Sequence, residues 1–321
     1  MIWLFLILAA VLFTIWVTVY VYLQCFHSPN DRNEDPYALI EGEQYDALSD
    51  VITACTRVMD CAPCEHLFVS SHDGLTLHAR YYHTKDNAPT VIVMHGYKGN
   101  ALRDGAGGFA LCRRLGFNVL VPDQRAHAQS QGRVITFGIK ERLDCLRWIA
   151  YINHRFGSDL PILLSGISMG AATVLMTAER NLPDNVLGIM ADCPYDSPAG
   201  IISKVCKDRG FPSKVILPFI RLSARIFGRF QLTETSAIDS VKSAKIPILL
   251  IHGDDDRFVP CDMSRQIAHY CASPVTLEIF PKAGHGLCYT TDPDRYEAVT
   301  YAFLKSLPRL SPYLPKEIFD N

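Results

Sequence analysis

The stretch that decides the fold is Pro161-Ile-Leu-Leu-Ser-Gly-Ile-Ser-Met-Gly170. Its apolar beginning predicts a buried strand, and the run Ala171–Arg180 that follows predicts a helix. Between them, Gly166, Ser168 and Gly170 have the G-x-S-x-G spacing of a nucleophile elbow, a tight turn that pushes a serine hydroxyl out above a sheet. Glycine suits the flanking positions, because a side chain there would collide with the adjacent strand and helix. The stretch therefore predicts that Ser168 is a nucleophile and not a buried turn serine.

Strand-like and helix-like segments alternate along most of the chain. A hairpin is expected at 67–71 and 75–82, around the turn His72-Asp-Gly74. Short apolar strands that alternate with helices predict a mostly parallel, doubly wound sheet with helices on both faces. The expected strands are 90–94, 118–121, 161–164, 187–191, 246–251 and 275–280, and the expected helices are 101–115, 138–155, 169–181, 261–271 and 291–306.

The N-terminus predicts a membrane anchor. Residues 1–23, MIWLFLILAAVLFTIWVTVYVYL, contain no charged side chain and are long enough to cross the hydrocarbon core as a helix. A cleaved signal peptide is the competing interpretation, but the usual basic start and small-residue cleavage site are absent. We expect one uncleaved transmembrane helix at 1–24. Lysine and arginine are too scarce beside it to orient it.

Composition narrows the class of partner and the compartment. Lys and Arg number 31 against 33 Asp and Glu, so nothing indicates a nucleic-acid partner. The eleven scattered cysteines suit reduced thiols better than a disulfide framework, which favours a cytoplasmic catalytic domain. Cys61-Ala-Pro-Cys64 is a lone C-x-x-C, either a redox or metal half-site or two linker thiols. The sequence does not indicate an oligomeric state.

Three further regions are expected beside the anchor. Residues 25–65 are predicted to be an acidic juxtamembrane spacer with a short helix near 43–59, and 311–321 a C-terminal tail. The main domain is expected at 66–310, with a helical cap inserted at about 195–244. In this cap Arg221, Arg225 and Arg229 fall on one helical face, and Val215, Phe219, Leu222 and Ile226 fall on another.

A serine hydroxyl becomes a nucleophile when a base removes its proton and an acid orients that base. Candidate acids are Asp254, Asp255 and Asp256, which follow the expected strand at 246–251. The candidate base is His285, which lies in a glycine-flanked loop after the last expected strand. The order Ser, Asp, His is the one that α/β-hydrolases use.

With these motifs the chain resembles the α/β-hydrolase superfamily over about 66–307. Within it, the chain is similar to a membrane-anchored bacterial branch related to prolyl oligopeptidase-like and ABHD-type serine hydrolases. The matching motifs are the elbow, His72-Asp-Gly74, His95-Gly-Tyr-Lys-Gly99, the loop at 122–132, the acid loop at 252–260 and Gly284-His-Gly286.

The resemblance implies roles for particular residues. It selects Asp256 as the acid, with Asp255 as the fallback, and pairs the backbone N–H groups of Tyr97 and Met169 as an oxyanion hole. Ala128 departs from the pattern, because relatives usually have glycine there. No zinc motif, phosphate-binding loop or dinucleotide fingerprint occurs, so we expect neither metal nor cofactor.

The expected activity is hydrolysis of an ester or related acyl bond through a Ser168–Asp256–His285 triad and an acyl-enzyme, as in carboxylesterases. A small acyl ester, a lipid-derived ester and a short peptide all remain possible substrates, so a serine peptidase is the second hypothesis. A non-catalytic binding protein on the same scaffold is the third. The basic cap either touches lipid or is a pocket lid with solvated arginines.

Overall fold

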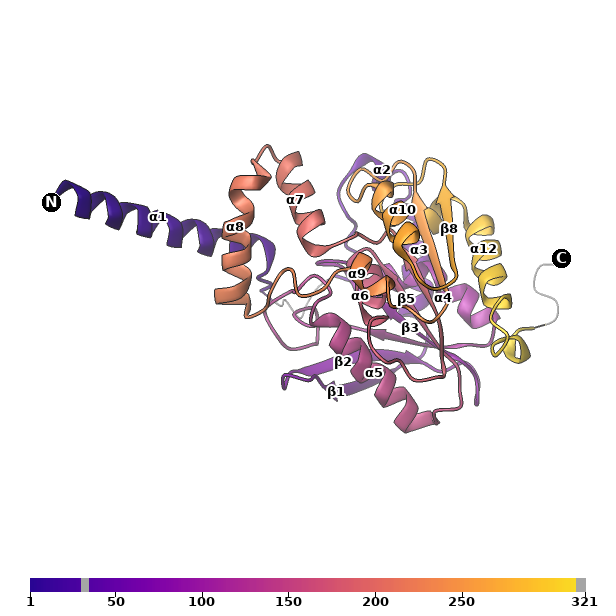
Figure 1. Ribbon diagram of the computed structural model, residues 1–321. Helices are drawn as coiled ribbons and strands as arrows, with labels where there is room; N and C mark the ends of the chain where they lie inside the picture. Colours follow the sequence, from indigo (N-terminus) through magenta and orange to yellow (C-terminus); the bar gives the residue numbers. More distant parts are fainter. Residues whose placement is uncertain (30–34, 316–321) are drawn as a thin grey trace.

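The computed structural model describes residues 1–29 and 35–315 (Figure 1). Within these ranges eight strands form one sheet, in the order β1-β2-β4-β3-β5-β6-β7-β8. β1 and β2 form an antiparallel hairpin, β2 pairs antiparallel with β4, and the other pairs are parallel. The strands are β1 (Glu65–Ser70), β2 (Thr76–Tyr82), β3 (Thr90–Met94), β4 (Asn118–Pro122), β5 (Ile162–Ile167), β6 (Val186–Asp192), β7 (Ile248–Gly253) and β8 (Val275–Phe280).

Helices cover both faces of the sheet, which confirms the predicted fold class. Consecutive strand residues point to opposite faces, so Leu163 packs in a core with α4 (Ala101–Arg114) and α12 (Pro293–Lys305). Leu164 packs in a second core on the other face. That core is closed by α5 (Glu141–Phe156), α6 (Met169–Thr177), α9 (Ala237–Val241) and α10 (Cys261–Tyr270).

The N-terminal helix α1 (Ile2–Cys25) projects from the domain and touches it only near its C-terminal end (Figure 1). There it packs against the cap, which consists of α7 (Pro198–Asp208), α8 (Ser213–Ser223) and the short π-helix η1 (Ala224–Gly228). The rest of the predicted insertion differs from expectation, because α9 packs against α6 in the core and not in the cap.

The buried side of α8 also differs from the pattern. Ile220 and Ala224 are buried, whereas Leu222 and Ile226, which were expected on an apolar face, are exposed. The apolar residues of this segment are therefore divided between a packed side and a side that faces solvent.

The predicted spacer is a packed part of the domain where the structure describes it. Helix α3 (Ser49–Asp60) packs against α4, and α2 (Glu43–Asp46) hydrogen-bonds to the loops that follow β7 and β8. Met59 is fully buried and fits over Gly105, where an added Cβ would lie 3.3 Å from the Met59 methyl. An amphipathic helix with a buried methionine does not remain in solvent, which is why the acidic composition misled the prediction.

The predicted C-terminal tail is likewise packed as far as it is described. A 3₁₀ turn η2 (Ser311–Tyr313) follows the buried Leu310, and the Tyr301 hydroxyl donates to the Pro315 carbonyl at 3.1 Å. The tail beyond 315, and residues 30–34 of the predicted spacer, lie outside the described residues. Short α11 (Cys288–Thr291) connects the His285 loop to α12.

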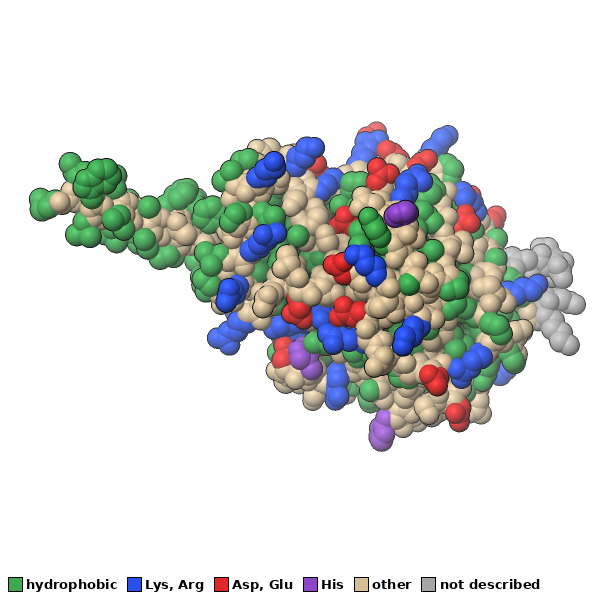
Figure 2. All heavy atoms as spheres, in the orientation of Figure 1, with side chains coloured by type: hydrophobic (Ala, Val, Ile, Leu, Met, Phe, Trp, Pro, Cys, Tyr) green, Lys and Arg blue, Asp and Glu red, His purple; other side chains and the backbone are tan. Residues whose placement is uncertain are grey.

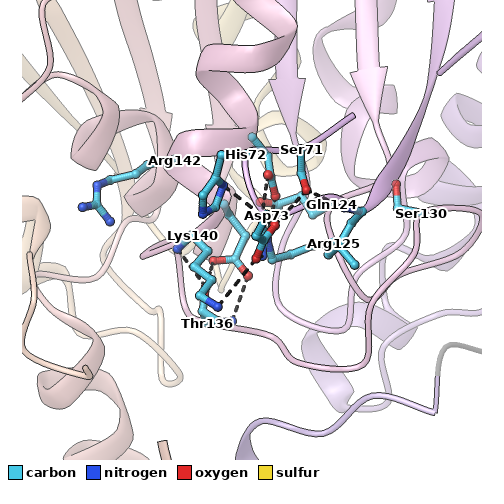
Figure 3. A network of polar contacts seen from close by, with 12 residues as sticks. Ser71, His72, Asp73, Gln124, Arg125, Ser130, Thr136, Lys140 and Arg142 are labelled. Carbon is cyan, nitrogen blue, oxygen red and sulfur yellow. Dashed lines mark hydrogen bonds and ion pairs between the residues drawn. The ribbon is translucent and has the colours of Figure 1, made fainter. Parts of the chain in front are cut away.

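An ionic network centred on the buried Arg125 ties the first hairpin to the layer of helices (Figure 3). Arg125, in the loop after β4, donates two hydrogen bonds to Asp144 of α5 at 2.6 and 2.7 Å. Its Nη1 and Nη2 donate to Asp73 in the hairpin turn at 2.9 and 3.1 Å, so Nη2 is shared by the two carboxylates. With its guanidinium committed to two carboxylates, Arg125 braces the loop that passes beside the site described next.

Candidate active site

Ser168 occupies the turn between β5 and α6 in a conformation that L-residues rarely adopt, with φ 55° and ψ −115°. The turn requires glycine on both sides. A Cβ on Gly170 would lie 1.9 Å from the Met94 carbonyl oxygen of β3, and one on Gly166 would lie 2.3 Å from the Gly170 carbonyl carbon. The G-x-S-x-G spacing thus forms an elbow that presents the serine at the carboxyl edge of the sheet.

The structure brings the three predicted triad residues into one hydrogen-bonded line. His285 Nε2 lies 2.8 Å from Ser168 Oγ, and His285 Nδ1 lies 2.7 Å from Asp256 Oδ2. Ser168 follows β5, Asp256 follows β7, and His285 follows β8, so three strand ends supply them. The distances are within the range for proton transfer from a nucleophile to a base.

Asp256 is held as an acceptor from several directions. Its Oδ1 accepts the backbone N–H groups of Phe258 at 2.9 Å and Val259 at 2.7 Å, and its side chain is fully buried. Burial alone would raise the pKa of Asp256, but hydrogen bonds from His252 and His285 hold it well below its ordinary value. The carboxylate therefore stays ionised near neutral pH.

The predicted oxyanion turn lies beside the serine. A Cβ built on Gly96 would be 3.6 Å from the Ser168 Cβ, so the turn after β3 approaches the nucleophile closely. Met169 is the first residue of α6, and a first-turn N–H has no partner within its own helix. The turn that carries Tyr97 and the first residue of α6 thus both lie next to Ser168, and the pairing of their N–H groups as an oxyanion hole stays a prediction.

Two histidines near the site support the backbone instead of facing the serine. His95 Nε2 accepts the Gln124 N–H at 2.9 Å, and His127 Nε2 accepts the Lys98 N–H at 3.1 Å. Burial lowers the pKa of both, to about 3 for His127, so they remain neutral acceptors. Ala128, where the resemblance led us to expect glycine, has φ 41°, a left-handed conformation that glycine adopts more readily than alanine.

Sequence reasoning missed several supports of the site. Asp104 Oδ2 accepts the Gly96 N–H at 2.9 Å and so holds the turn after β3 from α4. From the predicted spacer, the Tyr45 hydroxyl donates to the His285 carbonyl at 2.8 Å, and Gln44 Nε2 donates to Asp255 at 2.7 Å. No spacing links Gln44 and Tyr45 to partners more than 200 positions away, so no sequence signal could have found these two supports.

One group near the triad has the composition of a metal site. Atoms of Cys193, Asp256 and His285 lie within 4.8 Å of one another. Burial raises the pKa of the Cys193 thiol well above its ordinary value, whereas metals bind the thiolate. The Asp256–His285 hydrogen bond also occupies the atoms that would face an ion. The donor set suits a hydrogen-bonded triad better than a metal.

A cleft of about 750 Å³ opens at Ser168 and His285. It runs between α4 and the sheet, and the segment 38–41 lies along it. This volume is within the range of clefts that hold small-molecule ligands. Tyr97 also lines it, but its ring stacks on Phe137 at 4.9 Å and its hydroxyl donates to the Cys25 carbonyl of α1 at 2.9 Å.

Comparison with known proteins identifies the same fold. The family model described as alpha/beta hydrolase fold matches residues 89–206. The uncharacterised protein YqkD of Bacillus subtilis is 27% identical over 69% of this chain and 73% of its own length. The uncharacterised protein YfhR of Escherichia coli is 25% identical over 87% of this chain and 85% of its own.

Among solved structures, the esterase Pf2001 of Pyrococcus furiosus is similar in fold, with a TM-score of 0.62 and 20% identity. The alignment covers 78% of this chain and 95% of the esterase. At 20% identity the similarity supports a shared fold but does not indicate a shared substrate. Family match and fold together support a hydrolase.

Proposed function

Because the chain belongs to the α/β-hydrolase superfamily, we propose that it is a serine hydrolase that cleaves an ester or related acyl bond. The observation that carries the proposal is the hydrogen-bonded line from Ser168 through His285 to Asp256, with the serine on a strained elbow. A scaffold that only binds ligands needs neither this alignment nor a buried acid behind the histidine.

In the proposed reaction, Ser168 Oγ attacks the acyl carbonyl carbon while His285 takes the hydroxyl proton. The N–H groups of Tyr97 and Met169 stabilise the oxyanion, and loss of one such donor typically costs about 2.7–4 kcal/mol. The leaving alcohol departs with the proton from His285. Water then gives a proton to His285 and attacks the acyl-enzyme, which releases the carboxylic acid and restores Ser168. Asp256 holds the tautomer of His285 and stabilises its protonated form.

We further propose that α1 is a single-pass membrane anchor. Helix Ile2–Cys25 is long and apolar enough to cross a bilayer, and most of it is exposed. The catalytic domain proposed at 66–310 then lies against the membrane on one side. Its substrate is a small ester, a lipid-derived ester or a short peptide.

The test is covalent labelling of the full-length protein in detergent with a fluorophosphonate probe. We expect wild type to be labelled and Ser168→Ala to be silent, because the probe reacts only with an activated serine. Ser158→Ala, an exposed serine away from the site, is the matched control and should label like wild type. Undiminished labelling of Ser168→Ala would refute the assignment. A panel of acyl esters and aminoacyl amides then separates an esterase from a peptidase.

A further inference from the structure

A second cavity meets Ser168 from the cap side. It has a volume of about 190 Å³ and lies between α7, α8 and the last turns of α1. Ser168, Tyr97 and Phe258 line both this cavity and the larger cleft, so the two hollows join at the serine. A nucleophile between two hollows can hold the acyl part of an ester in one and the alcohol part in the other.

The walls of the smaller cavity suit a hydrocarbon chain. They are mainly apolar, although Gln24 and Arg209 also line them. The cavity is smaller than the clefts of roughly 300–1,000 Å³ that hold drug-sized ligands. One wall belongs to α1 itself. The lining residues that matter here are Val21 and Cys25 of α1, Ile201 and Val205 of α7, and Ile216 and Ile220 of α8.

The length of α1 places this cavity at the level of the bilayer. Ile2–Trp16 is almost wholly exposed, whereas Val17, Val21 and Phe26 pack with the cap. About fifteen residues of helix rise about 22 Å, which is short of the ~30 Å of a hydrocarbon core. If α1 spans the membrane, the rest of the hydrocarbon core must surround the turns of α1 that contact α8. The cap beside these turns then reaches the headgroup and acyl boundary.

The surface of the cap at this level has the chemistry of such a boundary. We call the exposed side chains of segment 221–229 the cap surface: apolar Leu222, Ile226 and Phe227, and basic Arg221, Arg225 and Arg229. Phe227 lies 5.5 Å from the Tyr22 ring of α1, so the surface is continuous with the anchor. Figure 2 shows the hydrophobic side chains along α1 and the basic side chains over the cap next to it.

The arginines of the cap surface are available to lipid. Across residues 1–29 and 35–315, no ion pair involves any of the three. Exposed apolar side chains interleaved with unpaired arginines, next to an apolar helix, complement an anionic lipid surface.

We propose that the smaller cavity is an acyl-chain site, and that a long-chain ester enters it from the bilayer between α1 and α8. The anchor then forms part of the substrate site and the cap surface seats it at the headgroups. This inference rests on the proposed serine hydrolase activity and on α1 as an anchor. It assigns the acyl chain to the cap side of Ser168 and the alcohol to the larger cleft.

The first test fills the cavity. Full-length Ile216→Trp in detergent is compared with wild type on p-nitrophenyl acetate and p-nitrophenyl decanoate. We expect the ratio of kcat/KM for decanoate over acetate to fall at least tenfold, because the indole takes the space of the chain. Val215→Trp is the matched control, since Val215 is exposed on the same helix and does not line the cavity. An unchanged ratio in a folded Ile216→Trp would overturn the acyl site.

The second test identifies the source of the substrate. Protein reconstituted into phosphatidylcholine–phosphatidylglycerol vesicles is given one of two substrates, a long-chain ester dissolved in the bilayer or a short-chain ester dissolved in the buffer. Ile226→Glu should lower the ratio of bilayer to soluble turnover at least fivefold, whereas Val58→Glu, an equally exposed site on α3, should not. An unchanged ratio in Ile226→Glu would overturn access from the bilayer. If wild type cleaves no ester and reacts with no fluorophosphonate, the proposed function itself fails.

Discussion

Three consecutive aspartates have different surroundings in this molecule. Asp254 accepts the Lys282 N–H at 2.6 Å and closes a turn. Asp255 is partly exposed and pairs with Arg257 and Gln44. Asp256 is buried against His285. Composition cannot distinguish the three, and only their positions along the loop give them separate roles.

Asp256→Asn should therefore lower kcat for ester hydrolysis by about 10⁴-fold, because an amide no longer orients the histidine tautomer or stabilises its cation. Asp255→Asn, the neighbouring control, should change kcat less than tenfold. Steady-state kinetics on one soluble ester measures both. If Asp255→Asn lost most of its kcat while Asp256→Asn stayed active, Asp255 and not Asp256 would be the acid of the triad.

Asp192, at the end of β6, has a titration that should affect stability. Burial raises its pKa to about 6, and Oδ1 has no hydrogen-bond partner among the described residues. An aspartate in the unfolded chain has a pKa near 3.9. Between about pH 4 and 6 the folded state holds more protons, so its stability falls as pH rises, by about 3 kcal/mol in all.

Asp192→Asn should remove this loss. We expect its free energy of unfolding to exceed that of wild type by up to about 3 kcal/mol at pH 8, and to match wild type near pH 3.5. Denaturant titration of the full-length protein in detergent at both pH values measures the difference. If the unfolding free energies of Asp192→Asn and wild type differed by the same amount at both pH values, the raised pKa of Asp192 would be contradicted.

At the scale of elements, strand patterns located the sheet well. The expected strands at 90–94 and 275–280 coincide with β3 and β8. Helix starts were less predictable: α5 begins at Glu141 and not at 138, because Gly138 has φ 88°, which a helix excludes. The spacing of apolar residues in the sequence shows which positions are buried. The backbone conformation of Gly138, which sets where α5 can begin, depends instead on its neighbours in space.

The elbow depends on the close approach of α6 to β3. Gly170→Ala should destabilise the protein by more than about 3 kcal/mol or prevent folding, because its Cβ would overlap the Met94 carbonyl. Gly108→Ala in α4 is the control. Nothing lies within 4 Å of its Cβ, so it should stabilise the helix by about 0.8–1 kcal/mol. Thermal unfolding in detergent compares the two, and a harmless Gly170→Ala would show that the elbow can widen.

At the scale of the whole molecule, Phe26 joins α1 to the domain. It is fully buried and lies edge-on to Phe137 at 5.8 Å and to Phe230 at 5.3 Å. Phe137 follows the loop after β4, and Phe230 follows the cap. Phe26 thus helps to hold α1 against the parts that surround Ser168, together with the contacts of Tyr22 and Cys25.

Phe26→Ala should cost about 3–5 kcal/mol of stability, because it empties a packed aromatic cluster. Phe5→Ala, on the exposed part of α1, should leave the unfolding free energy of the domain unchanged. Denaturant midpoints of the full-length variants in detergent test this. Equal, small effects would mean that α1 is attached loosely.

The sequence by itself determined the α/β class, the elbow at Ser168, the candidate acid and base, and the apolar N-terminal segment. These follow from short-range spacing and periodicity, which are properties of the linear sequence and do not depend on the folded structure. The tertiary structure alone decided that Tyr45 supports the His285 loop, that Tyr97 binds the end of α1, and that α1 walls a cavity at Ser168. These contacts join common side chains across long stretches of sequence, and only the folded path of the chain brings them together.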